Sequence, residues 1–308
     1  MEQKMVSIED ALTFANDLIC MEQFAQAETI ANQVLQLSPE NQKAVAILNT
    51  LDAMRNGIYE ASLKNGLVYF GKVHAAKQSW DVRTQHMEAL LTHECGRHVG
   101  EEFNFLEVGS WAGGSAILWA NTLKKCGKKN AKVICVDAWA DYINLDYNAN
   151  SVHRAMKSAF EDDGIFRLFN HNIRCSGNAD MVLPFRGKSC DLMKMFTPGY
   201  FDAVYVDGDH TYQACHQDIL DGMKLVKEGG VLCGDDLELQ YHEVDEAYLR
   251  QVARDHDCVT DPKTQKFYHP GVALAVWEAF HQAVTAKDGF WAMRKTGGVF
   301  VPVNSTDW

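Results

Sequence analysis

The chain has 308 residues, of which 47% are hydrophobic and 23% are charged, and its formal net charge is -12. This composition is typical of a globular protein, and the length allows one large domain or a medium domain with a smaller one. The negative charge argues against a nucleic-acid-binding protein, because contacts with phosphates depend on Lys and Arg. No run approaches the ~18 apolar residues of a membrane-spanning helix, so we expect no membrane partner.

Nine cysteines are scattered along the chain without a Cys-x-x-Cys pair. An odd number with this spacing indicates free thiols rather than a disulfide framework or a zinc site. The N-terminal sequence MEQKMVSIEDAL has no apolar core of signal-peptide length. We therefore expect a cytoplasmic protein.

Residues 7–54 have the patterning of three helices. Ser7 is typical of an N-cap and predicts a helix that ends near Cys20. A second helix is expected over Phe24–Leu37, and Asn41 begins a third. The run MEQFAQAETIANQVLQLSPEN resembles the second half of a tetratricopeptide repeat. A single such unit must bury its face elsewhere, so we expect it to pack on the rest of the chain, on a second copy in a homodimer, or on a partner protein. A plain helical hairpin without a docking role is the alternative.

From Phe103 onward, short apolar runs alternate with helical stretches. This order predicts an α/β fold with a Rossmann-like, doubly wound and mostly parallel seven-stranded sheet. Two runs on either side of Thr296-Gly297-Gly298 predict a C-terminal antiparallel hairpin. The predicted strands are Phe103–Val108, Lys132–Val136, Met181–Phe185, Phe201–Val206, Val231–Cys233, Trp291–Lys295 and Val299–Val303.

The chain is thus expected to have three parts. Residues 1–60 form the small all-α, tetratricopeptide-like segment, residues 61–100 form a helical bridge, and residues 101–308 form the α/β domain.

A glycine-rich turn follows the first predicted strand, in the sequence FLEVGSWAGGSAILWA. Such a turn lets backbone amides approach a ligand at the carboxyl end of a strand, where open α/β sheets bind ligands. The spacing of Gly109, Gly113 and Gly114 is not the G-x-G-x-x-G of a dinucleotide fold. Glu107, which precedes the turn, favours a ligand with a cationic amino group.

Acidic residues end the next predicted strands. Asp137 ends the strand in VICVDAW and is well placed for both hydroxyls of a ribose, although an exposed Asp at a strand end is the alternative. Asp207 follows one strand, and Asp235 and Asp236 follow its neighbour. These three carboxylates would repel one another unless a cation lies between them, and all-oxygen ligands favour Mg²⁺ or Ca²⁺. A solvated acidic loop is the alternative.

Taken together, these motifs resemble the class I methyltransferases of the macrocin and sugar O-methyltransferase type, which are often magnesium-dependent. The features that carry the resemblance are EVGSWAGGS, VDAWADY, FNHNIRCSGNADMVLPFRGKS, FDAVYVDGDHTY and LVKEGGVLCGDD. The resemblance implies an enzyme that transfers a methyl group from S-adenosylmethionine to a hydroxyl of a sugar or another small molecule (EC 2.1.1.-). The helical front is not part of the core of that family.

The resemblance also implies a role for each residue. His210 would act as the general base, with Asp207 as the other candidate, because the pKa of an imidazole lies near working pH. The alternative for His210 is a histidine that caps a helix or that only orients a neighbouring residue of the site. Mg²⁺ would be held by Asp207, Asp235 and Asp236. The cofactor would be lined by Glu107, Gly109, Ser110, Gly113, Ser115, Asp137, Ala138, Trp139, Gly187, Lys188, Ser189 and Asp207.

Two other functions remain open. An inactive α/β binding module that docks a partner through its helical front is one, although such a module has no need of three clustered carboxylates. An NAD-dependent oxidoreductase is the other, but the glycine spacing is wrong and the chain has no Tyr-x-x-x-Lys pair. His242 and His269 could line the acceptor pocket or be ordinary surface residues.

Overall fold

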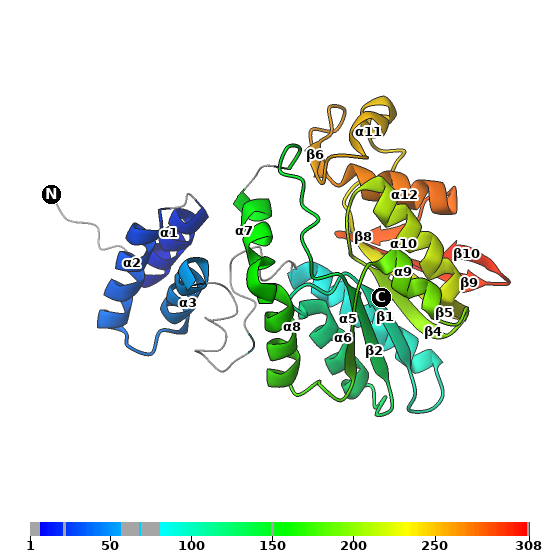
Figure 1. Ribbon diagram of the computed structural model, residues 1–308, viewed down its shortest axis with the longest axis horizontal. Helices are drawn as coiled ribbons and strands as arrows, with labels where there is room; N and C mark the ends of the chain where they lie inside the picture. Colours follow the sequence, from blue (N-terminus) through cyan, green and yellow to red (C-terminus); the bar gives the residue numbers. More distant parts are fainter. Residues whose placement is uncertain (1–6, 21–22, 57–67, 69–80, 149–150, 307) are drawn as a thin grey trace.

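The structure is a computed structural model. It describes the whole chain except for residues 1–6, 21–22, 57–67, 69–80, 149–150 and 307. Much of the predicted helical bridge therefore lies outside the described residues. In the part of the chain that the structure describes, no helix is long and apolar enough to cross a membrane. Figure 1 shows a unit of three helices and, next to it, a twisted sheet with helices on both faces.

The N-terminal unit consists of α1 (Ile8–Cys20), α2 (Phe24–Leu37) and α3 (Gln42–Asn56), so the three predicted helices are confirmed. Ser7 caps α1, because its Oγ accepts a hydrogen bond from the backbone N–H of Asp10 at 3.1 Å. The helices share a core made largely of alanine and other aliphatic side chains, separate from the cores beside the sheet. Small side chains let the helices approach closely. The tetratricopeptide likeness of this unit stays a prediction.

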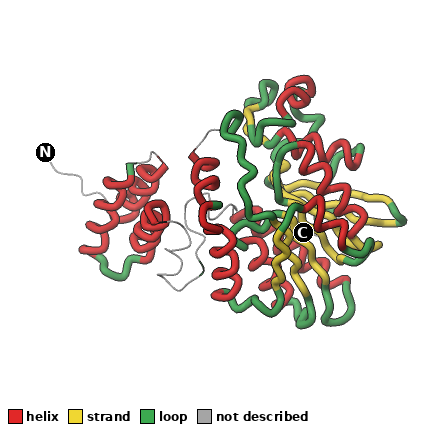
Figure 2. Tube along the Cα trace, in the orientation of Figure 1, coloured by secondary structure: helices red, strands yellow, loops and turns green. Residues whose placement is uncertain are grey.

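The central sheet confirms the predicted fold class. Its strands follow the order β10-β9-β5-β4-β1-β2-β3, in which β1 to β5 run parallel and β9 and β10 form the antiparallel C-terminal hairpin. Figure 2 shows the strands in yellow and the helices in red. A short strand, β8, also pairs with β9, so this sheet has eight strands rather than the seven predicted. The strands are β1 (Asn104–Val108), β2 (Lys132–Asp137), β3 (Val182–Arg186), β4 (Phe201–Val206), β5 (Val226–Leu237), β8 (Thr285–Lys287), β9 (Gly289–Thr296) and β10 (Val299–Pro302).

Helices cover both faces of this sheet because successive strand residues point to opposite sides. In β1, Phe105 packs with the side chains of α5, α6 and α8, whereas Leu106 packs with those of α10 and α12. These two cores are the layers of a doubly wound fold. The α-helices that the structure describes after the N-terminal unit are α5 (Asp81–Arg97), α6 (Gly114–Lys125), α7 (Ser151–Ala159), α8 (Gly164–Cys175), α9 (Ser189–Leu192), α10 (Tyr212–Leu225), α11 (Glu246–Val252) and α12 (Pro270–Phe280).

Three smaller elements complete the described chain. Two short 3₁₀ helices span Glu161–Asp163 and Met193–Met195. A separate two-stranded sheet pairs β6 (Val259–Thr260) with β7 (Phe267–Tyr268).

Helix α5 is fixed to the sheet, although it precedes the first strand in the chain. The fully buried carboxylate of Glu94 accepts two hydrogen bonds from the Arg294 guanidinium of β9, at 2.8 and 2.5 Å. Such a two-pronged, charge-assisted contact fixes orientation as well as distance. This pair therefore holds α5 in one position relative to β9.

Candidate active site

The carboxyl ends of β1 and β4 touch at Gly109. The Gly109 N–H donates to the Val136 carbonyl at 2.9 Å, and the Asp207 N–H donates to the Val108 carbonyl at 2.8 Å. Gly109 has φ of +85°, and a Cβ placed there would lie 1.9 Å from the carbonyl oxygen of Asp207. Only glycine fits this position, so the glycine turn starts where two strand ends meet.

Glu107 is a buried carboxyl directly beneath this turn. Its Oε2 accepts hydrogen bonds from Ser110 Oγ at 2.6 Å and from Cys135 Sγ at 3.3 Å. Burial raises the pKa of Glu107 to about 7, although Ser110, Ser115 and Cys135 act to lower it. Its buried Oε1 has no hydrogen-bond partner among the described residues. A cationic group of a ligand could satisfy this oxygen, and the interpretation of Glu107 as the partner of such a group stays a prediction.

Asp137 holds the glycine turn in place. Its Oδ2 accepts hydrogen bonds from the backbone N–H groups of Ser110 and Trp111, both at 2.9 Å, and its Oδ1 accepts one from the Trp139 N–H at 2.6 Å. Burial raises the pKa of Asp137, while these three N–H groups act to lower it. The ribose role stays a prediction, and the structure adds a second role, since this carboxylate shapes the loop that a cofactor would touch.

The other predicted cofactor residues follow β2 and β3. Trp139 is only 1% exposed, and its ring packs against those of Phe166 and Phe169 at centroid distances of 4.8 and 4.7 Å. It therefore lies in the core beside the turn rather than on an open surface. The Gly187 N–H donates to the Asp137 carbonyl at 2.9 Å, which brings the end of β3 to the same edge.

The remaining residues predicted to touch the cofactor flank these positions. Ala138 directly follows β2, and Lys188 and Ser189 lie where α9 begins. Gly113 precedes α6 with φ of +86°, and Ser115 lies in the first turn of that helix. Together with Glu107 and Asp137, they border one edge of the sheet, as strand ends in an open α/β sheet should.

The three predicted metal-binding carboxylates come together at the ends of β4 and β5. Tyr205 Oη donates to Asp207 Oδ2 at 3.0 Å and lies 3.4 Å from Asp235 Oδ2. The Asp236 N–H donates to Asp235 Oδ1 at 2.8 Å, and Asp236 itself has φ of +61°, where the β5 pairing with β9 is irregular. Burial and the Asp236 charge raise the pKa of Asp235, although Arg83 acts to lower it. The neighbouring carboxylates therefore repel one another at this point, and Arg83 reduces that repulsion.

His210 is the predicted base, and it lies between two carboxylates. Its Nδ1 is 2.7 Å from Asp257 Oδ1, and its Nε2 is 3.0 Å from Asp236 Oδ2 and 3.8 Å from Asp207 Oδ1. Burial alone would lower the pKa of His210, but the charges of Asp236 and Asp257 raise it well above its ordinary value. The geometry orients the ring by Nδ1 and presents Nε2 to the cluster, which suits a base or a metal ligand.

His269 belongs to the same site, whereas His242 is exposed and lies outside it. The ring centroids of His210 and His269 are 4.9 Å apart, and His269 Nδ1 is 3.0 Å from Glu238 Oε2. Burial would lower the pKa of His269, but Asp236 and Glu238 raise it overall. Two imidazoles with raised pKa values thus face the carboxylates.

Four residues of this site have no motif that could have revealed them. They are Arg83 in α5, His153 in α7, Glu238 after β5 and Asp257 before β6. Asp257 bonds both His210 and His153, and His153 Nε2 lies 3.0 Å from Asp257 Oδ2. Three of the four come from helices or loops rather than from the ends of parallel strands. Glu238, which lies one residue beyond β5, was the nearest to a sequence signal.

A divalent ion fits part of this donor set. One ligand atom each of Asp207, His210 and Asp236 lie within 4.8 Å of one another, a spacing that a single ion can bridge. Asp235 is not part of this group. Its Oδ1 lies 2.8 Å from Arg83 Nη1 and accepts the Asp236 N–H, and its Oδ2 lies 3.4 Å from Tyr205 Oη.

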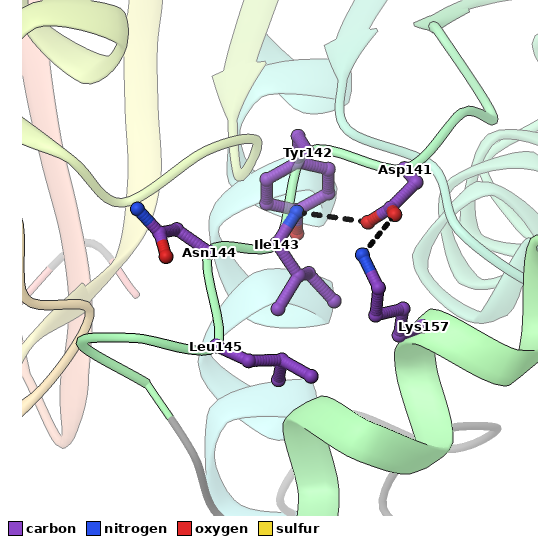
Figure 3. A pocket seen from close by; sticks show the side chains of 6 residues that line it. All are labelled: Asp141, Tyr142, Ile143, Asn144, Leu145 and Lys157. Atoms are coloured by element: carbon purple, nitrogen blue, oxygen red, sulfur yellow. Dashed lines mark hydrogen bonds and ion pairs between the residues drawn. The ribbon is translucent and has the colours of Figure 1, made fainter.

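A hollow of about 460 Å³ lies beside α7, in the loop that follows β2. Figure 3 shows the residues that line it, with Lys157 of α7 paired to Asp141. The Ile143 N–H also donates to Asp141, at 3.0 Å. Tyr142 presents a half-exposed aromatic ring here. The lining residues are Asp141, Tyr142, Ile143, Asn144, Leu145 and Lys157.

Comparisons with known proteins point to one family for this region. Residues 106–237 match the model of a family described as a methyltransferase domain. No curated protein matches the chain. The matched region holds the glycine turn, Asp137, Asp207, His210 and the Asp235-Asp236 pair.

Solved structures that are similar in part include three O-methyltransferases. NovP is 17% identical over 70% of this chain and 79% of its own, with a TM-score of 0.48. TomG from Streptomyces achromogenes, in complex with SAM, is 16% identical over 77% of this chain and 90% of its own, with a TM-score of 0.44. An O-methyltransferase from Bacillus cereus, in complex with SAH, is 17% identical over 80% and 94%, with a TM-score of 0.41. The family match is the finding that bears on this site: residues 106–237 are similar to a methyltransferase domain.

Proposed function

We propose that the protein is an S-adenosylmethionine-dependent O-methyltransferase that acts on a hydroxyl of a sugar or another small molecule. One observation carries the proposal. The glycine turn, tied to the carboxylate of Asp137, lies at the same sheet edge as the cluster around Asp207 and His210. A cofactor bound over the turn would thus face an acceptor bound at the cluster, and the family match over residues 106–237 supports the same activity.

In this proposal the protein acts mainly by positioning. Glu107 would receive the amino group of the cofactor, and the backbone N–H groups of the turn would approach its methionine part. His210, held by Asp257 at Nδ1, would take the acceptor proton at Nε2, and Asp207 is the alternative base. The half-exposed ring of Tyr142 supports an acceptor bound beside the hollow near α7.

Mg²⁺ is the divalent ion that we propose for the cluster. Asp207 and Asp236 fit it best, and Asp235 is the third carboxylate that the resemblance implies. When bound, such an ion lowers the pKa of an acceptor hydroxyl and helps to orient it. The protein's part is to present the carboxylates at one edge of the sheet.

Calorimetric titration of the chelator-treated protein with S-adenosylhomocysteine, repeated after addition of Mg²⁺, tests the proposal. Micromolar binding of S-adenosylhomocysteine is expected. Absence of binding under both conditions would contradict the proposed function.

Asp137→Ala should weaken S-adenosylhomocysteine binding by at least about tenfold, since each lost hydrogen bond to a charged group contributes roughly 1.5–3 kcal/mol. The variant loses both a ribose partner and the acceptor of the three N–H groups that shape the turn. Calorimetry gives the affinity, and Asp180→Ala, at an exposed carboxylate near Lys124, is the control. Unchanged affinity in Asp137→Ala would remove this residue from the site.

The affinity for S-adenosylhomocysteine should rise with pH between about pH 6 and pH 8 and then level off, because a cationic amino group binds the ionised form of Glu107. The pKa of Glu107 in the free protein is raised to about 7, so below that pH the carboxyl must lose a proton to bind a cation. Titrations at several pH values measure the slope. In Glu107→Gln the slope should disappear, and a slope that persists there would contradict this role.

A further inference from the structure

Arg83 is a buried cation inside the acidic cluster. Its Nη1 lies 2.8 Å from Asp235 Oδ1 and 2.6 Å from Asp236 Oδ1, and its Nη2 lies 2.5 Å from Glu238 Oε1. Its Nε donates to the Asp288 carbonyl at 2.6 Å. The side chain is only 7% exposed. The guanidinium is therefore enclosed by oxygen atoms.

The backbone is shaped to receive this guanidinium. Gly289 has φ of +93°, and a Cβ at this position would lie 2.5 Å from Nη2 and 2.7 Å from Cζ of Arg83. Glycine removes that clash and accepts the positive φ. The Glu94–Arg294 pair fixes α5 against β9, the strand that Gly289 begins. Helix α5, Gly289 and the three carboxylates together form a preorganised binding site for the guanidinium.

The contacts divide the three carboxylates into two groups. Asp235 Oδ1 is paired with Arg83, and Asp235 Oδ2 lies near the hydroxyl of Tyr205. Asp236 Oδ1 is paired with Arg83, whereas Asp236 Oδ2 is near His210 Nε2. Asp236 is therefore grouped with His210 and Asp207. An oxygen that is bonded to a guanidinium is a poor metal ligand, because the two cations would repel each other. Asp235 Oδ2 is not bonded to Arg83 either, but among the described residues only Asp207 and Asp236 have carboxylate oxygens that lie, with a nitrogen of His210, within 4.8 Å of one another.

We propose that Arg83 is a built-in cation of this site that holds Asp235 as its counter-ion, so that a divalent ion is held by Asp207 and Asp236 and not by Asp235. The proposal rests on the proposed function for the presence of a divalent ion. Arg83 is then a positioning residue that acts through Asp235 and Asp236. It also sets how strongly the site attracts a second cation.

The affinity of the chelator-treated full chain for Mg²⁺, measured by calorimetry, tests the proposal. Asp236→Asn should weaken Mg²⁺ binding by more than about 30-fold, whereas Asp235→Asn should change it by less than about threefold, because only the former removes a ligand. Arg83→Gln should tighten Mg²⁺ binding by about tenfold or more, since a unit charge is lost a few ångströms from the ion. Arg83→Lys keeps the charge and should stay near the wild-type affinity.

A second step separates the role of Arg83 from a general effect on folding. Once Arg83 is Gln, Asp235 is released, and adding Asp235→Asn to that variant should now weaken Mg²⁺ binding. Arg250→Gln is the matched control, because Arg250 is an exposed arginine of α11 that pairs with Glu278 at 3.1 Å, and it should leave the Mg²⁺ affinity unchanged. If Arg83→Gln does not fold, the comparison of Asp235→Asn with Asp236→Asn still decides the question.

Equal losses of Mg²⁺ affinity in Asp235→Asn and Asp236→Asn would overturn the proposal, and so would weaker binding in Arg83→Gln. Mg²⁺ binding that appears only in Arg83→Gln would support it, whereas no binding in either wild type or that variant would overturn it. Titration with S-adenosylhomocysteine is a separate measurement that tests only the proposed function. Its failure would contradict the proposed function, while the Mg²⁺ comparison would still report on Arg83.

Discussion

His210→Ala should lower kcat by about 10²- to 10⁴-fold, the usual contribution of a positioned base, and should leave S-adenosylhomocysteine binding unchanged. The imidazole presents Nε2 to the cluster, while Nδ1 is held by Asp257 at 2.7 Å. The carboxylates nearest to this ring are those of Asp207, Asp236 and Asp257, and none of them belongs to the glycine turn, where the cofactor is proposed to bind. Steady-state kinetics and calorimetry on the same preparation measure the two effects.

The pH profile distinguishes a base from a merely structural histidine. The charges of Asp236 and Asp257 raise the pKa of His210 above its ordinary value, so the rate should rise with pH as the imidazolium loses its proton. Asp257→Asn removes one of those charges and should move the rising limb to lower pH. His242→Ala, at an exposed position, is the control. Normal turnover in His210→Ala would leave Asp207 as the base.

Gly109→Ala should destabilise the protein by about 4 kcal/mol or more, or prevent folding, because overpacking and a positive φ act together. The added Cβ would lie 1.9 Å from the Asp207 carbonyl oxygen and 2.7 Å from the Gly208 Cα. Both are backbone atoms at the junction of β1 and β4, so neither can move without separating the strand ends. Urea unfolding measures the loss of free energy.

Gly127→Ala is the matched control for that substitution. Gly127 also has a positive φ, +75°, but nothing lies within 4 Å of its added Cβ. Only the backbone conformation is then penalised, at roughly 1–2 kcal/mol. If the two variants lose the same free energy, the close approach of β1 and β4 does not constrain the site.

The parts of the fold that follow from local patterns could be predicted from the sequence. Apolar runs place β1 to β5, and in a parallel sheet the carboxyl ends of neighbouring strands meet at one edge. That rule alone predicts that Asp207 and the Asp235-Asp236 pair lie close together, as they do. Strand β8 was missed because three residues are too few to show a period.

The cations and orienting groups of the site could not be predicted in this way. Arg83 reaches Asp236 across 153 residues of sequence, and Asp257 reaches His210 across 47. Arg83 comes from a helix and Asp257 from a loop, and no periodicity relates such positions to a strand end. The carboxylates repel one another, which indicates that a cation is needed but not which one. The sequence therefore points to a metal, whereas the structure places a guanidinium on one side.

Helix α5 has a consequence for how this protein can be dissected. Residues 106–237 match the methyltransferase family, but the guanidinium inside the acidic cluster comes from Arg83, outside that region. A fragment that begins at Phe103 would keep all of the strands and lose both Arg83 and the Glu94 anchor. A fragment that still pairs Asp235 with a cation must therefore begin before Arg83, whereas a fragment that contains every strand can begin at Phe103.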